Sequence, residues 1–86
     1  MNIDEVKRTI QDGNQVAKSG RATLEQLDSE VAATEAYARI TIHDSQDQDA
    51  QAGLEILAGF HRETELTVRR VDAAVDHANA YLGTIG

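Results

Sequence analysis

The residues with the best spacing for chemistry are histidines and carboxylates in the second half of the chain. His61 precedes Glu65 by one helical turn, which would place an imidazole beside a carboxylate, as at the start of a metal site. The heptad pattern described below, however, puts Leu24 opposite His61 instead of a third ligand. We therefore predict no metal and interpret His61 as a partly buried structural histidine; a pH-responsive interface is the alternative.

The other histidines give no stronger signal. His77 lies close to Asp72 and Asp76 in the sequence, which indicates a solvated polar face, and His43 is expected to be exposed in a turn. Asp44, Asp47 and Asp49 alternate as in a calcium loop, but the glycine and the distal bidentate glutamate of such a loop are missing. Helix capping explains these aspartates better.

Catalytic motifs are missing from the sequence. It has no glycine-rich phosphate loop, no nucleophile elbow and no cysteine. We therefore predict that the chain is not an enzyme and that it uses no cofactor and no small-molecule substrate.

Composition narrows the function classes further. A chain of 86 residues forms one small domain, whose core is limited without disulfides, a metal or a partner. The net charge of -7 argues against nucleic-acid binding. No apolar run approaches the ~20 residues of a membrane span, and no signal-peptide core is visible at the N-terminus. We expect a cytoplasmic protein, with export by a signal-peptide-independent route left open.

Small and apolar residues recur at alternating intervals of three and four in both halves, the a and d positions of heptads. The first array comprises Ile3, Val6, Ile10, Gly13, Ala17, Gly20, Leu24, Leu27, Val31, Thr34 and Ala38. The second comprises Ala50, Leu54, Leu57, His61, Thr64, Val68, Val71, Val75, Ala78, Leu82 and Ile85. Within a single domain, 1–86, they predict helices over about 3–39 and 46–82, joined by a turn at about 40–45.

Signals for helix ends agree with this division. Asn2 with Glu5, and Ser45 with Gln48, have the spacing of capping boxes. The β-branched run 40–42 mildly disfavours helix and is expected to end the first one.

A reversal near residues 40–44 matches the two arrays in one register. Leu27 then meets Leu57, Arg21 falls opposite Glu65, and Gly13 and Gly20 become sites of close helix approach opposite larger residues. The predicted fold is therefore all-α, an antiparallel two-helix hairpin resembling a coiled coil, which a partner completes to a four-helix bundle.

The two edges of this hairpin differ. The e positions are polar and indicate a solvated edge, whereas the g positions carry all three aromatic residues, Tyr37, Phe60 and Tyr81. The f positions of the second helix are also small or apolar, which extends this surface. Such a patch predicts a partner interface, formed by Val16, Tyr37, Phe60, Leu66, Ala73, Ala74, Ala80 and Tyr81. Alternatively, the small residues are ordinary surface, and Phe60 and Tyr81 only cap the seam.

A short acidic chain built as a helical hairpin resembles the WXG100 (ESAT-6-like) proteins of type VII, or ESX-like, secretion, across nearly its whole length. The family's Trp-x-Gly turn motif is absent because the chain has no tryptophan, and Ile85 stands where its export signal has an acid four residues after Tyr81. The resemblance implies pairing as homo- or heterodimers and roles as secreted partners, adaptors or chaperones of larger effectors. It carries over no functional residue.

The resulting hypothesis is a protein–protein interaction module that binds another helical protein, or itself as a dimer. A homo-oligomeric scaffold is the first alternative, because strict heptads suit it equally well. An acidic inhibitor or immunity protein is the second.

Overall fold

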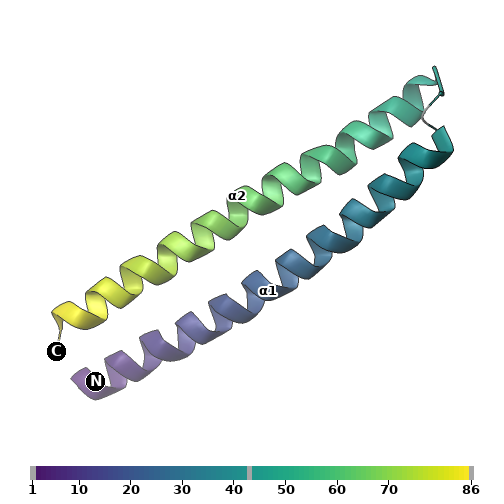
Figure 1. Cartoon of the computed structure of the whole chain (residues 1–86). Coiled ribbons are helices and arrows are strands. Elements are labelled where there is room, and N and C mark those ends of the chain that lie inside the picture. The colour runs from purple at the N-terminus through teal and green to yellow at the C-terminus, as the bar shows by residue number, and fades with distance from the viewer. Residues whose placement is uncertain (1, 43, 86) are drawn as a thin grey trace.

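The structure is a computed structural model that describes residues 2–42 and 44–85. The described residues form two helices, α1 (Ile3–Ile42) of 40 residues and α2 (Gln48–Thr84) of 37 residues. They lie antiparallel, so the two ends of the chain meet opposite the turn (Figure 1). The molecule is a thin rod with extents of 63 × 16 × 15 Å. The predicted all-α helical hairpin is confirmed.

Side chains cap the start of each helix. The Asn2 Oδ1 atom accepts a hydrogen bond from the amide of Glu5 at 2.8 Å, as the sequence indicated. At α2 the cap is Asp47, whose Oδ1 accepts from the amides of Asp49 and Ala50 at 2.8 and 3.1 Å. Ser45, the predicted cap, lies in the turn before the helix, where its hydroxyl accepts a hydrogen bond from the amide of Asp47. The helix therefore begins at Gln48, later than the predicted 46.

The chain reverses later than the β-branched run suggested. α1 continues through Ile40, Thr41 and Ile42, and the Thr41 hydroxyl donates to the carbonyl of Tyr37 at 3.1 Å. Each β-branched residue costs a helix only a few tenths of a kcal/mol. Ile42, half-buried against the start of α2, offsets that cost. His43, expected in an exposed turn, lies outside the described residues.

This later reversal moves the register by one heptad. The Arg21 Nε atom donates to Asp72 Oδ1 at 2.7 Å, and Asn14 Nδ2 donates to Asn79 Oδ1 at 3.0 Å. Asp72 lies one heptad beyond Glu65 in the same e column, so the predicted pairing of Arg21 with Glu65 is wrong. The predicted contact between Leu27 and Leu57 belonged to the same incorrect register.

α1 is also rotated relative to the predicted seam. Its half-buried residues lie mainly in the a and e columns, and Gly13, Gly20 and Leu27 of the d column are exposed. The d column offers little to bury because two of its members are glycine, whereas the e column reaches α2 with hydrogen-bonding side chains. α2 keeps its a and d seam, which holds the three buried residues of the described chain, Leu54, Thr64 and Val75.

Gly13 and Gly20 are therefore not sites of close approach, since a Cβ atom added at either would meet nothing within 4 Å. We predict that Gly13→Ala and Gly20→Ala each raise the free energy of unfolding by about 0.5–1 kcal/mol, because alanine loses less conformational entropy in a helix. Urea unfolding followed by circular dichroism measures this.

The exposed Ala22 of α1 offers a matched control. Ala22→Gly should lower the free energy of unfolding by a similar amount. A loss of stability in either glycine-to-alanine variant would show that the close approach predicted from the heptads exists after all.

Candidate protein interface

A ladder of polar contacts joins the e column of α1 to residues of the e and a columns of α2. It comprises Asn14 with Asn79, Arg21 with Asp72, and Asp28 with His61. The expectation of a solvated edge is therefore corrected: Asn14, Arg21 and Asp28 are half-buried and bonded across the seam.

Hydrogen bonding to Asp72 raises the pKa of Arg21 above its ordinary value. Partial burial of Arg21 opposes this rise, and the negative charges of Asp72 and Glu25 add to it.

His61 is a member of this ladder and is not the partly buried histidine that the heptads predicted. Its side chain is 57% exposed, and its Nδ1 atom lies 2.8 Å from Asp28 Oδ2. It borders a shallow pocket of about 160 Å³ with Glu25, Asp28, Thr64, Glu65 and Val68. Within residues 2–42 and 44–85, no group of three or more histidine and acidic side chains has a metal-binding arrangement. His61 thus serves as a polar contact between the helices.

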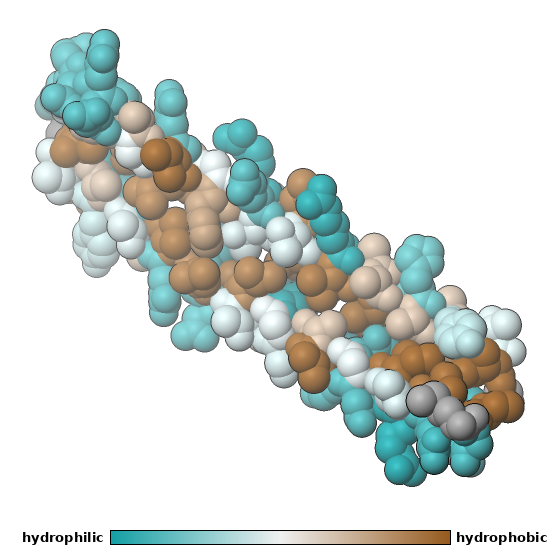
Figure 2. Space-filling view, turned by 180° about the vertical axis from the view of Figure 1, so that it is seen from behind, coloured by the Kyte–Doolittle hydropathy of each residue, from teal (hydrophilic) through white to brown (hydrophobic). Residues whose placement is uncertain are grey.

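Most of the residues predicted to form the partner interface lie on the surface. Tyr37 and Val16 are 74% and 73% exposed, and Tyr81 and Leu66 are 51% and 45% exposed. Ala73, Ala74 and Ala80 are exposed as well, whereas Phe60 is half-buried. Apolar side chains reach the surface along the hairpin from the turn end to the open end, with polar ones on both sides (Figure 2).

Four further large apolar residues are exposed that the sequence did not assign to the interface, namely Ile3, Leu27, Ile40 and Ile56. Ile3 and Leu27 were placed in the seam, and the rotation of α1 leaves Leu27 outside it. Ile40 was interpreted only as part of a helix end. Ile56 stands in a c column that is otherwise polar, so no pattern marked it.

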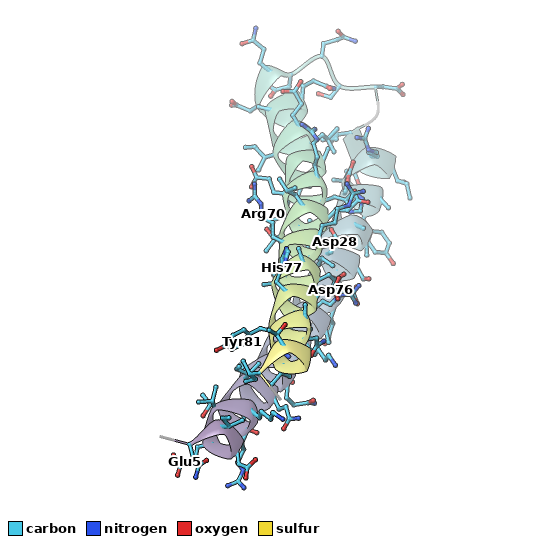
Figure 3. All side chains as sticks on the ribbon, turned by 90° about the vertical axis from the view of Figure 1, so that its left-hand side faces the viewer. Glu5, Asp28, Arg70, Asp76, His77 and Tyr81 are labelled. Atoms are coloured by element: carbon cyan, nitrogen blue, oxygen red, sulfur yellow. The ribbon has the colours of Figure 1, made fainter. Side chains whose placement is uncertain are left out.

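The predicted interface residues of α2 do not form one uninterrupted patch. Successive residues of a helix are rotated by about 100°, so the c column of α2 lies between its f and g columns. This c column carries Glu63, Arg70 and His77, and Figure 3 shows Arg70, His77 and Tyr81 along the same side of α2. We call the f, c and g columns together the outer face of α2. It consists of two apolar strips separated by a charged line.

An apolar groove opens at the turn end of the hairpin. Its volume is about 390 Å³, and aliphatic side chains dominate its lining, which consists of Ala38, Ile42, Asp49, Ala50, Gly53, Leu54, Ile56 and Leu57. Gly53 helps to keep it open, since a Cβ atom there would meet nothing within 4 Å. An apolar cavity of about 150 Å³ already holds a benzene ring, so this groove has room for an aromatic side chain. In the sequence, the signal for this groove was a glycine, Gly53, in the g column. The groove could not be located from it, because the part of α1 that lies beside Gly53 depends on the register.

None of the described helices is long and apolar enough to cross a membrane.

The polar ladder allows a direct test of the register. We predict that Arg21→Gln and Asp72→Asn each destabilise the hairpin, and that the double variant loses less than the sum of the two, because the residues are bonded at 2.7 Å. The measurement is a double-mutant cycle from urea unfolding. The matched cycle of Arg21→Gln with Glu65→Gln should be additive; coupling in that cycle alone would support the register that we have rejected.

No protein-family model matches the chain, and the comparisons with curated proteins and with solved structures gave no significant match. The two-helix hairpin is compatible with a WXG100-like architecture, and this compatibility concerns the fold alone.

Proposed function

We propose that the chain is a non-enzymatic protein–protein interaction module, a helical hairpin that serves as partner, adaptor or chaperone of another helical chain. The observation that carries this proposal is an imbalance of burial. Only Leu54, Thr64 and Val75 are buried among the described residues. Eight large apolar side chains of the same part of the chain are exposed: Ile3, Val16, Leu27, Tyr37, Ile40, Ile56, Leu66 and Tyr81.

A second layer of helices would cover this surface. Two helices alone can bury only the stripe that each turns toward the other, and stable helical domains usually add further helices against the remaining apolar face. Covering apolar surface contributes about 25 cal/mol per Å². The exposed tyrosines and the groove near the turn therefore favour a packed partner over a hairpin that works alone.

A place in a type VII secretion or effector-delivery system is a narrower form of this proposal. Only the hairpin architecture supports it, together with its compatibility with WXG100-like proteins. The binding role itself rests on the exposed surface and holds in any biological setting.

The proposal separates residues that hold the hairpin together from residues that bind the partner. We predict that Leu57→Glu unfolds the hairpin, because Leu57 packs in the seam, whereas Phe60→Glu and Tyr81→Glu weaken assembly and leave the chain helical. Circular dichroism measures the helix, and sedimentation equilibrium measures assembly. Ala22→Glu, at an exposed position away from this surface, is the control that should change neither.

Two results would contradict this division. One is a loss of helix in Tyr81→Glu as severe as in Leu57→Glu. The other is a wild-type chain that stays a well-folded monomer and binds the dye ANS no better than an ordinary globular protein.

A further inference from the structure

The outer face of α2 is complementary to itself in one antiparallel arrangement. Resting on the function proposed above, we propose that the partner on this face is a second copy of the chain. The two α2 helices pack antiparallel about a two-fold axis that passes beside Leu66 and Thr67. Like columns then meet across the interface, f against f, c against c and g against g.

The charged line selects this register. With the axis at Leu66 and Thr67, Glu63 faces Arg70 of the second copy, and the symmetry forms the same ion pair twice. Sliding the second copy by one heptad in one direction places Glu63 against Glu63, and sliding it in the other places Arg70 against Arg70. A symmetric parallel arrangement has no stagger, so it places Glu63 against Glu63 and Arg70 against Arg70.

The apolar strips independently support the same register. Tyr81, which is 51% exposed, comes opposite Gly53 of the second copy, where the groove of about 390 Å³ is open. Its ring therefore enters a groove large enough to hold it, and the symmetric tyrosine enters the other. Phe60 faces the small Ala74 in the same way, and Gly59 faces Ala73, which lets the helices approach closely.

Two pairs of like charges in the b column oppose the arrangement. Arg62 faces Arg69 and Glu55 faces Asp76 of the second copy across the outer margin, and the symmetry forms each contact twice. There the Arg69 side chain is 73% exposed and already lies 3.4 Å from Glu65. Charges in water are screened strongly at such margins, so this repulsion is weaker than the attraction along the central line.

A charge exchange tests the pairing of Glu63 with Arg70. Glu63→Arg and Arg70→Glu should each weaken dimerisation about tenfold, because each replaces two attractive contacts by two repulsive ones. The double variant Glu63→Arg/Arg70→Glu restores both pairs and should return to within a few-fold of the wild type. Sedimentation equilibrium at low salt measures all four proteins. A double variant weaker than either single one overturns the pairing.

Cysteine cross-linking tests the axis, since the natural chain has no cysteine. Thr67→Cys should form a disulfide-linked dimer on mild oxidation, because the two copies of residue 67 face each other. Ala74→Cys should not, because its two copies lie about 20 Å apart along the helices. Equal cross-linking of both variants indicates a parallel arrangement and overturns the proposal.

Filling the groove tests the place of Tyr81. Gly53→Leu should abolish the dimer and leave the helical signal unchanged, because a side chain at this position has open space within its own hairpin. A dimer that tolerates Gly53→Leu, or that lacks the Thr67→Cys cross-link, overturns this packing and leaves the interaction module standing. A chain still monomeric at about 1 mM overturns self-association altogether. If that monomer also binds no ANS, the proposed function fails with it.

Discussion

The hydrogen bonds from Arg21 to Asp72 set how the two helices face each other. An arginine reaches across the seam from the e column, and the neighbouring contacts of Asn14 and Asp28 follow the same line. With this edge turned inward, the d column of α1 is turned toward solvent. Leu27 and the two glycines therefore lie outside the seam, and the apolar side of the hairpin becomes wider than an a and d packing would leave it.

That wider apolar side is the basis of the proposed binding role. α1 has no buried residue and α2 has three, so the seam supports the hairpin without covering the apolar groups of either helix. The open groove near Gly53 and the exposed Tyr81 lie toward opposite ends of α2. In an antiparallel pair of copies, the Tyr81 ring of each copy can therefore lie in the groove of the other. In the proposed dimer, the charged line between the strips selects the alignment.

Much of the architecture could be predicted from particular residues, and the errors have one physical source. The heptads from Ile3 to Ala38 and from Ala50 to Ile85 correctly indicated two antiparallel helices, and Asn2 correctly marked the first start. A heptad pattern is unchanged when one helix slides by seven residues, so it cannot choose between Glu65 and Asp72 as the partner of Arg21. That choice depended on where the chain turned, which the small penalty of the β-branched run did not decide.

The sequence by itself determined the periodicity of both helices, their antiparallel pairing and the concentration of aromatic residues in the g columns. These properties follow from the order of side chains along a helix of known pitch. Only the tertiary structure decided the rotation of α1, the exposure of Gly13 and Gly20, and the opening of the groove beside Gly53. The reason is that rotation about a helix axis depends on how far opposing side chains reach. Arginine, asparagine and aspartate could cross the seam to partners on α2, and glycine had nothing to place there.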